Sequence, residues 1–242
     1  MIRVVVVDDE ALIRTGFQHI LNTADDIEVV AAVPGGQAVR AVRELRPAVV
    51  LLDIRMPDVD GLTVLTDLRR LPDPPVVAML TTFNMDEYVA TALRTGAAGF
   101  LLKDTDPEQL PHLVRSLADG GVVLSSKVTR TVVDGYLAGG RWEPAARLVG
   151  RLTARERHVL VLISEGLSNT DIGGRIHLST STVKDHVSAL LGKLEVSTRV
   201  QAALLAERAG LLEASQDQPQ DQSRDHSREQ SRNQSREQEH GG

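Results

Sequence analysis

Acidic side chains follow two short apolar runs of the sequence, where they could bind a cation. Asp8, Asp9 and Glu10 follow the run RVVVV, and Asp53 follows the run AVVLL. Clustered carboxylates repel one another and raise each other's pKa unless a cation lies between them. Mg²⁺ is the usual hard divalent cation for a set of oxygen ligands. These acids therefore predict a Mg²⁺ site if the fold brings them together.

A hydroxyl and an ammonium group follow two further apolar runs. The run MLTT contains Thr81, and the run GFLLK ends in Lys103. Next to a metal ion these groups suit phosphoryl transfer, with Asp53 as the nucleophile and with Thr81 and Lys103 on the phosphoryl oxygens. Each residue alone also has a structural explanation, because acids cap helices, hydroxyls stabilise turns and lysines cover surfaces. The combination of residues favours the phosphoryl-transfer hypothesis.

These residues can act together only if the fold places them at one edge of a sheet. Five apolar runs, separated by amphipathic stretches of helical period, are the candidate strands. They lie at 3–7, 27–33, 48–52, 75–80 and 99–103. Apolar strands that alternate with helices are typical of a parallel sheet covered on both faces, and such sheets bind ligands at the carboxyl ends of their strands. The sequence predicts a five-stranded, parallel, doubly wound (flavodoxin-like) α/β domain over 1–120.

The last helix of this domain, at roughly 107–119, contains two prolines. Pro107 suits a first helical turn, but Pro111 would remove a backbone donor from the helix interior. We therefore expect this helix to begin late or to bend.

Composition excludes several classes of protein. With 42% apolar residues the 242-residue chain can bury cores, and no apolar run reaches the roughly 18 residues of a membrane span. The sequence contains no cysteine for a disulfide, a thiolate metal site or a nucleophile. The N-terminal stretch lacks the small-residue cleavage site of a signal peptide. We expect a soluble cytoplasmic protein without membrane contact.

The remaining chain divides into three segments. Residues 121–149 contain Gly-Gly and Pro between short apolar runs, which indicates a linker with a helix over Ser126–Leu137. Residues 150–212 have helical patterning throughout and predict a small all-α domain of four helices. In the tail at 213–242, the part after Ala214 repeats units such as EQSR without aliphatic or aromatic residues, so we expect the tail to be disordered.

Charge separates the two predicted domains. Residues 1–120 carry 11 Lys and Arg against 18 Asp and Glu, a net charge of −7. Residues 151–213 carry 8 against 7, a net charge of +1. If any part of the chain binds a polyanion such as DNA, the second of these segments is the candidate.

The all-α segment contains the pattern of a helix-turn-helix. In NTDIGGRIHLSTSTVKDHVSALLGKL a short helix, a tight turn and a longer helix follow one another, and the longer one, at 182–194, would be the recognition helix. The preceding helix begins with Thr153 and Glu156, the spacing of a capping box, and stops before Gly166. Any helical hairpin has a similar layout, so the spacing alone leaves a plain helical bundle open.

The first domain resembles the receiver domain of bacterial response regulators. The resemblance covers 1–120 and rests on DDE, LLDIRMPDVDG, MLTT and GFLLKD, in that order. It implies that Asp53 is the phospho-acceptor. It also implies that Asp9, Asp53 and the backbone carbonyl of Arg55 bind Mg²⁺ directly, and that Asp8 assists through water.

The same resemblance implies a switch. The Thr81 hydroxyl would move toward the phosphoryl group while the Phe100 ring turns inward, and Lys103 would pair with the phosphate. On composition alone Phe100 is an ordinary core residue. Pro111 departs from the family pattern in a helix that such domains often use for phosphorylation-driven pairing.

The helical domain resembles the LuxR/NarL-type DNA-binding domain. The resemblance rests on LTARERHVLVLISEGLSNTDI and STVKDHVSALLGKL. It implies DNA contacts by Ser179, Thr182 and Lys184, with His186 and Lys193 as weaker candidates near the DNA backbone. For His186, packing against the buried apolar stripe of the helix is an equal alternative. For Lys193, the alternative is a solvated position at the end of the helix.

Three features depart from this second family pattern. Gly173-Gly174 falls inside the first helix of the motif, and each glycine costs about 0.5–1 kcal/mol relative to alanine. Glu195 stands after the recognition helix, where the family usually has glycine. Asp185 would repel phosphates but could accept a hydrogen bond from a cytosine amino group.

Together the two resemblances imply a transcriptional response regulator rather than a metabolic enzyme. A sensor histidine kinase would phosphorylate Asp53, dimers would form, and the dimer would bind promoter DNA at paired half-sites. RNA polymerase is a candidate further partner. Two alternatives remain: a regulator of the same architecture that works without phosphorylation, and a Mg²⁺-dependent aspartyl-phosphate phosphatase. The phosphatase class has its nucleophile in a D-x-D arrangement after the first strand, and DDE does not have that spacing.

Overall fold

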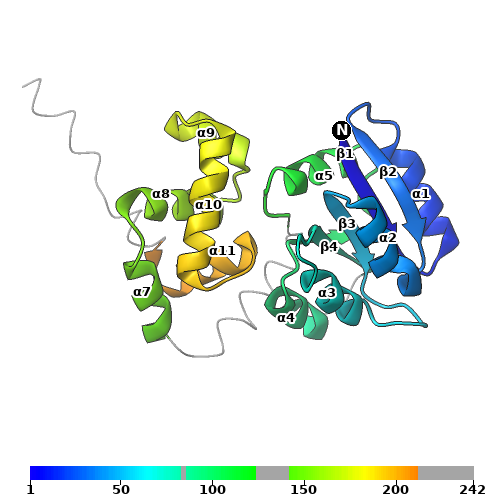
Figure 1. Ribbon diagram of the computed structural model, residues 1–242, viewed down its shortest axis with the longest axis horizontal. Coiled ribbons are helices and arrows are strands. Elements are labelled where there is room, and N and C mark those ends of the chain that lie inside the picture. Colours follow the sequence, from blue (N-terminus) through cyan, green and yellow to red (C-terminus); the bar gives the residue numbers. More distant parts are fainter. Residues whose placement is uncertain (83–85, 124–141, 212–242) are drawn as a thin grey trace, which may run out of the picture. The chain divides into compact units, whose positions relative to one another are not determined.

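The computed structural model describes residues 1–82, 86–123 and 142–211, which form a sheet domain and a helical domain (Figure 1). The predicted helix over 126–137 and the predicted disordered tail at 213–242 lie outside these residues. Within them, no helix is long and apolar enough to cross a membrane.

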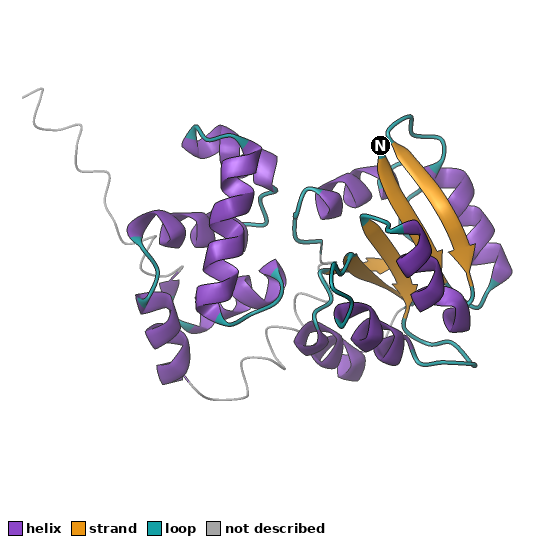
Figure 2. Ribbon diagram, in the orientation of Figure 1, coloured by secondary structure: helices purple, strands orange, loops and turns teal. Residues whose placement is uncertain are grey.

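Five parallel strands form one sheet in the order β2-β1-β3-β4-β5 (Figure 2). The strands are β1 Ile2–Val7, β2 Ile27–Val33, β3 Val49–Asp53, β4 Val76–Thr81 and β5 Gly99–Leu102. The prediction of a five-stranded parallel sheet is confirmed, and each strand begins and ends within one residue of its predicted bounds. The register pairs Asp53 with Leu80 and Thr81 with Leu102, so the ends that carry the candidate residues lie at the same edge.

Helices cover both faces of the sheet, as predicted for a doubly wound fold. They are α1 Ala11–Leu21, α2 Ala38–Leu45, α3 Gly61–Arg69, α4 Asp86–Thr95 and α5 Leu110–Ala118, and a 3-10 turn, η1 Gly35–Gln37, precedes α2. Residues of α2, α3 and α4 pack on one face, and residues of α1 and α5 pack on the other.

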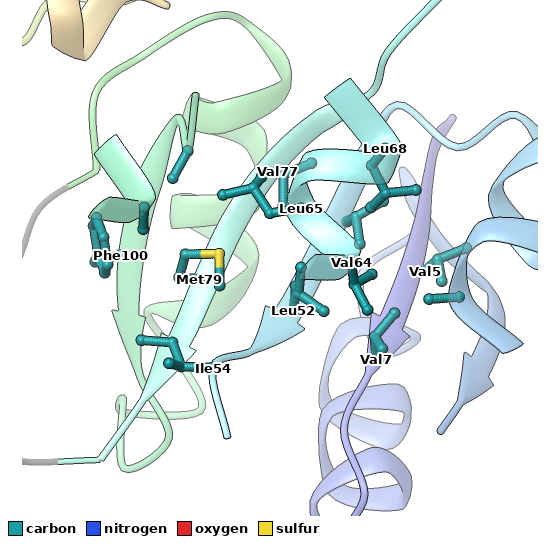
Figure 3. Packing of buried hydrophobic residues seen from close by; sticks show 14 of the residues in the cluster. Val5, Val7, Leu52, Ile54, Val64, Leu65, Leu68, Val77, Met79 and Phe100 are labelled. Atoms are coloured by element: carbon teal, nitrogen blue, oxygen red, sulfur yellow. The ribbon is translucent and has the colours of Figure 1, made fainter. Parts of the chain in front are cut away.

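The sheet residues divide between the two faces because neighbouring side chains on a strand point in opposite directions. Val50 and Leu52 belong to the first apolar cluster, which Figure 3 shows together with Phe100. Val49 and Leu51 belong to the second cluster. All five residues of β3 are buried, which makes β3 a central strand and fixes the position of the carboxylate at its end.

The position of Pro111 explains why the last helix of the sheet domain is short. Helix α5 begins at Leu110 rather than near 107, and Pro111 lies in its first turn. The first turn of a helix tolerates proline, because the amide hydrogen that proline lacks has no helical acceptor there. Of the two predicted outcomes, the late start is the observed one.

The helical domain consists of five described helices. They are α7 Trp142–Gly150, α8 Ala154–Ser164, α9 Asn169–Ile176, α10 Thr180–Leu194 and α11 Arg199–Arg208. Helix α7 lies inside the segment that was interpreted as a linker, and it buries Ala145 and Val149. The sequence does not indicate this helix, because Gly139-Gly140 and Pro144 are typical of loops.

Helix ends in this domain follow the capping signals of the sequence. Thr153 and Glu156 form the predicted capping box at the start of α8. Gly166, with φ 85°, follows that helix in the left-handed conformation that glycine adopts easily. Glu195 also has a left-handed backbone, with φ 58°, at the end of α10. A side chain makes this conformation less favourable, in agreement with the expected departure at this position.

The two neighbouring glycines of α9 have different surroundings. A Cβ atom on Gly173 would lie 2.6 Å from the carbonyl oxygen of Leu178 in the turn that leads to α10. A Cβ atom on Gly174 would meet no atom within 4 Å. Gly173 therefore lets the turn fold back closely on α9, whereas Gly174 has no such role.

We expect opposite effects from alanine at these two positions. Gly174→Ala should raise the free energy of unfolding by about 0.5–1 kcal/mol, because alanine is the better helix former. Gly173→Ala should lower it by about 1–3 kcal/mol, because the turn must move to accommodate the methyl group. Denaturant unfolding of the two variants and the parent measures both effects. Equal changes in the two variants would contradict the difference in surroundings.

Candidate functional site

Three carboxylates meet at the carboxyl ends of β1 and β3. Asp8, Asp9 and Asp53 each place an oxygen atom within 4.8 Å of the others. Asp8 is fully buried and Asp53 is 4% exposed, whereas Asp9 is exposed. The convergence that the sequence predicted is therefore present in the fold.

A lysine ammonium lies among these acids. Nζ of Lys103, which follows β5, is 2.9 Å from Oδ2 of Asp8, 3.1 Å from Oδ2 of Asp53 and 3.2 Å from Oε1 of Glu10. Burial alone would lower the pKa of Lys103, but its hydrogen bonds to Asp8 and Asp53 raise that pKa above the ordinary value. The ammonium is therefore charged and offsets part of the repulsion between the carboxylates.

The pKa of Asp53 is raised to about 6. Burial, which disfavours the carboxylate form, is the main cause, and the charge of Asp8 adds to it. The hydrogen bond and the charge of Lys103 oppose the rise. Asp53 is thus a carboxylate whose negative charge is incompletely balanced by the protein itself.

The donor set fits a hard divalent cation. The carboxylate oxygens of Asp8, Asp9 and Asp53 are the ligands that such a cation prefers. Oδ1 of Asp8 accepts a hydrogen bond from the Glu10 amide at 2.9 Å. Oδ2 of Asp8 is buried and accepts no well-directed hydrogen bond from the described residues, although the Lys103 ammonium is 2.9 Å away. An additional positive charge at this position would satisfy that oxygen.

The two residues of the predicted switch lie on neighbouring strands. Thr81, at the end of β4, is 4% exposed, and its hydroxyl donates to the carbonyl oxygen of Thr82 at 2.8 Å. Phe100, on β5, is 1% exposed and packs in the cluster of Figure 3. The ring already has the inward position that the resemblance assigns to the phosphorylated state, while the hydroxyl is engaged elsewhere.

Two backbone contacts at this site were not predicted from the sequence. Nη1 of Arg14 donates to the backbone carbonyls of Asp8 and Asp9 at 2.7 and 2.9 Å, and so holds the acidic turn from the first helix. Gly61 packs so closely on the end of β3 that an added Cβ would overlap the carbonyl oxygen of Asp53.

The side chain of Arg55, whose carbonyl was the predicted metal ligand, lies 5.1 Å from the ring centre of Tyr88.

Helices α9 and α10 form the expected helix-turn-helix. His177 ends α9 in the left-handed conformation, and the amide of Leu178 donates to the carbonyl of Gly173 at 2.9 Å. Ser179 caps α10, since its Oγ accepts the amide hydrogen of Thr182 at 3.1 Å. The two hydroxyl oxygens of Ser179 and Thr182 are 2.8 Å apart. Two of the predicted DNA contacts thus also stabilise the start of the recognition helix.

The remaining candidates on α10 differ in their surroundings. Val183, Val187, Leu190 and Leu194 are buried in the domain. Lys184 is exposed and His186 is partly buried. These placements leave Lys184 the most accessible basic group at the N-terminal part of the helix.

Lys193 has a partner inside the helical domain. Its Nζ is 2.7 Å from both carboxylate oxygens of Glu156 on α8. Glu156 is 6% exposed, and its pKa is lowered to about 2, first by this hydrogen bond and then by the amide of Thr153. The pair links α8 to the recognition helix, and no spacing in the sequence indicates it. Its position suits a structural role better than the predicted DNA contact.

Arg199 makes a second link that the sequence did not indicate. From α11 it donates to Oδ1 of Asn169 at 2.8 Å and to the carbonyl of Leu167 at 2.7 Å. Both acceptors belong to the turn before α9 or to its first residue. The bonds therefore hold the helix-turn-helix against α11.

Comparison with known proteins identifies the family. Residues 4–115 match the family described as response regulator receiver domain, and residues 150–206 match bacterial regulatory proteins, luxR family. The nitrate/nitrite response regulator protein NarL of Escherichia coli is 38% identical over 202 residues, which cover 83% of this chain and 93% of NarL. The chain is a two-component response regulator of the NarL/LuxR family.

Other relatives of this response regulator agree with that assignment. An uncharacterized transcriptional regulatory protein of Bacillus subtilis, YhcZ, is 37% identical over 211 residues, covering 86% of this chain and 97% of YhcZ. The crystal structure of a LuxR-family response regulator from an Aurantimonas species has a TM-score of 0.51 at 23% identity, over 56% of this chain and 97% of that one. This last likeness concerns the fold alone.

The assignment gives the response regulator its general function. It is a DNA-binding transcription factor rather than an enzyme, and its receiver domain contains the acidic pocket of Asp8, Asp9 and Asp53. The receiver domain implies a kinase as partner, and the helix-turn-helix domain implies DNA.

We expect Lys193→Met in this regulator to lower the free energy of unfolding of the helical domain by about 1–2 kcal/mol at pH 7, because it leaves the buried Glu156 carboxylate without its ammonium. The pKa of Glu156 is lower in the folded state than the ordinary 4.5, so its stabilising effect is full above about pH 4.5 and is lost as the pH falls toward 2. Denaturant unfolding at pH 7 and at pH 3 should therefore show a smaller loss on acidification for the variant than for the parent. Lys184→Met, which changes an exposed lysine of the same helix, is the control and should leave stability unchanged.

Proposed function

We propose that the regulator is phosphorylated on Asp53 by a sensor histidine kinase, and that phosphorylation promotes dimerisation and promoter binding. The observation that carries this proposal is the position of Lys103, 3.1 Å from Asp53 and 2.9 Å from Asp8 in a buried acidic pocket. A single buried carboxylate at a strand end has many uses. Three carboxylates around one ammonium, with Thr81 on the next strand, suit the capture of a phosphoryl group.

The reaction follows from the groups present. An oxygen of the Asp53 carboxylate attacks the phosphorus of a phosphohistidine. The new P–O bond forms as the P–N bond breaks, and the departing imidazole takes up a proton. Lys103 then moves from the two carboxylates to the oxygens of the new acyl phosphate. Mg²⁺, held by Asp9, Asp53 and the Arg55 carbonyl with Asp8 in support, would neutralise the charge of the acids and of the phosphoryl oxygens.

The switch begins with a hydrogen bond that can be exchanged. The Thr81 hydroxyl donates to Thr82 in this structure, and a phosphoryl oxygen on Asp53 would be a stronger acceptor. Phe100 is already buried in the core, so the Thr81 hydroxyl is the part of the proposed switch that still has to move. We infer that phosphorylation draws Thr81 toward Asp53 and that the α4–β5–α5 surface changes with it. Pro111 keeps α5 short on that surface.

Phosphorylation-independent regulation is the second candidate for this chain. The complete set of Asp8, Asp9, Asp53, Thr81 and Lys103 favours phosphorylation, since a receiver that does not use the reaction has no need for the set. A phosphatase is disfavoured, because the central carboxylate follows β3 rather than β1.

Asp53→Asn should abolish labelling of the protein by a small phosphodonor in the presence of Mg²⁺. The label on the parent should be stable in acid and labile in base, as expected for an acyl phosphate. Asp58→Asn changes an exposed acid of the loop after β3 and should leave labelling intact. Labelling of Asp53→Asn at the parental rate would show that another residue is the acceptor. Steady release of phosphate from generic phosphate esters would instead favour the phosphatase.

DNA binding should require two copies of the helical domain. Its net charge of +1 over residues 151–213 gives weak electrostatic attraction to DNA, so a monomer should bind poorly. A dimer doubles the contacts and reads two half-sites with its two recognition helices. Ser179, Thr182 and Lys184 are the proposed contacts, with His186 and Lys193 as weaker ones.

Lys184→Ala should weaken binding of the phosphorylated regulator to DNA by about tenfold, because each protomer loses a phosphate contact. Fluorescence anisotropy with a fragment selected from genomic DNA measures this, and the slope of log affinity against log salt should become shallower. Phosphorylation of Asp53 should be unaffected. Lys193→Ala is the matched comparison and should change the stability of the domain more than its DNA affinity. Parental affinity and salt slope in Lys184→Ala would rule out Lys184 as a contact.

A further inference from the structure

A second charged region lies at the amino-terminal edge of the sheet, opposite to the acidic pocket. A cavity of about 810 Å³ opens there, in the sheet domain alone. Its lining includes four arginines of the 11 Lys and Arg in residues 1–120. They are Arg3, Arg43, Arg46 and Arg70. The proposed phosphorylation and DNA binding use none of them.

The topology brings these arginines together. In a parallel sheet covered by helices, the strands begin where the helices end, and Figure 2 shows the amino terminus at the edge away from the arrowheads. Arg3 is the second residue of β1, and strand alternation directs it to the same face as Val5 and Val7. Arg43 lies in the last turn of α2, and helices α2 and α3 cover that face.

The other two arginines stand at helix ends. Arg46 is the C-cap of α2, with φ 45° and ψ 61°, and Arg70 is the C-cap of α3. A left-handed backbone at a residue other than glycine is unfavourable by about 1 kcal/mol or more. The fold thus keeps an arginine where a glycine would be better for stability alone.

Positive charge in this cavity is poorly compensated. Asp73 is the one acid among its lining residues, although the domain as a whole has a net charge of −7. Arg70 is 3.4 Å from Asp67 in an exposed pair, which is weak. Within the described part of the chain, Arg3, Arg43 and Arg46 make no ion pair. Their guanidinium groups are exposed and available to an anion.

Shape and apolar walls indicate the size of the anion. The volume lies in the usual range for a small-molecule site of roughly 300–1,000 Å³. Three prolines that lie close together in the chain, Pro72, Pro74 and Pro75, line the cavity, and we refer to them as the proline wall; Val42 also lines it. Proline fixes its own backbone angle, so this wall is rigid before a ligand arrives. A site with several guanidinium groups around an apolar wall suits a ligand with several phosphates and one flat apolar part.

Helix ends explain only part of this arrangement. Cations near the C-terminus of a helix interact favourably with its last carbonyl groups, which would account for Arg43, Arg46 and Arg70 without any ligand. Arg3 belongs to a strand and has no such reason to point there. Its register partner on β2 is Glu28, but the described residues show no ion pair between Arg3 and Glu28, so the guanidinium of Arg3 is free to face the cavity that it lines.

We propose that this cavity binds a small ligand with two or more phosphate groups, such as a nucleoside diphosphate or triphosphate. The forked guanidinium groups of Arg43 and Arg46 bind phosphate oxygens in pairs, Arg3 and Arg70 add charge at the sides, and the proline wall contacts the nucleoside. The site is separate from the acidic pocket, which lies at the other edge of the sheet. It gives the receiver domain a second input that does not depend on phosphorylation of Asp53.

Isothermal titration of the full chain tests this proposal with three probes: inorganic tripolyphosphate, ADP and adenosine. The buffer contains EDTA, so that no metal-bridged binding occurs at the acidic pocket, and salt at about physiological strength (~0.15 M). We expect saturable binding of tripolyphosphate and ADP, tighter for ADP if the proline wall contributes, and none of adenosine. Binding should weaken as salt is raised.

Variants then locate the binding. Arg43→Gln combined with Arg46→Gln should weaken ADP binding by at least about tenfold, because two charge-assisted hydrogen-bonding groups are lost. Arg40→Gln is the matched control on the same helix: Arg40 pairs with Glu44 outside the cavity, and its loss should leave binding unchanged. Asp53→Asn should also bind ADP as the parent does, which separates this site from the proposed phosphorylation.

Three results would overturn the proposal. The first is that neither tripolyphosphate nor ADP binds saturably. If the double variant is then also less stable to denaturant than the parent, the arginines have a role at the helix ends only. The second is an equal loss of binding in Arg40→Gln, which would make the attraction unspecific. The third is a loss of ADP binding in Asp53→Asn together with parental binding in the double variant, because the ligand would then lie in the acidic pocket.

Discussion

The contact of the Lys103 ammonium with the carboxylates of Asp8 and Asp53 is the interaction on which the receiver site depends. Two buried carboxylates at neighbouring strand ends are unfavourable by themselves, and burial raises the pKa of Asp53 to about 6 even with the lysine present. Lys103 follows β5, which is separated from β3 by β4. The fixed register of the sheet sets the end of β5 level with the ends of β3 and β4, so the long lysine side chain can extend across β4 to the carboxylates. The parallel order of the sheet and the charge balance of the site therefore constrain each other. A cation or a phosphoryl group can enter because this balance is incomplete.

Much of this site could be predicted from the sequence, for a geometric reason. Strands that are buried on both faces are apolar throughout, so their ends are visible as the first polar residue, as at Asp53 after VVLL. A parallel sheet then collects these ends at one edge without further information. Local signals were equally readable: the capping box of Thr153 and Glu156 and the left-handed Gly166 depend on residues close together in the chain.

What the sequence did not reveal depends on contacts between distant residues. The family resemblance made Lys193 a weaker candidate for DNA contact, with a solvated helix end as the alternative, and neither reading included its ion pair with Glu156, 37 positions away. Arg14 reaches the carbonyls of the acidic turn, and no spacing rule marks such a bond from a side chain to the backbone. Helix α7 lies among glycine and proline signals that normally indicate a loop, and its burial of Ala145 and Val149 outweighs them. Periodicity shows which face of an element is apolar but not which element covers it.

The same topology also separates charge along the strands. Helices α1 and α3 begin at the acidic edge, where their amide groups carry partial positive charge, and α2 and α3 end at the opposite edge, where their carbonyls carry partial negative charge. Acids at the first edge and arginines at the second are therefore both favoured before any ligand is considered. This preference applies to Arg43, Arg46 and Arg70, which belong to helix ends, but not to Arg3 on β1. An anion in the second cavity would be repelled by the helix carbonyls, so it can bind only if the arginines outweigh them. Four guanidinium groups against Asp73 provide that excess.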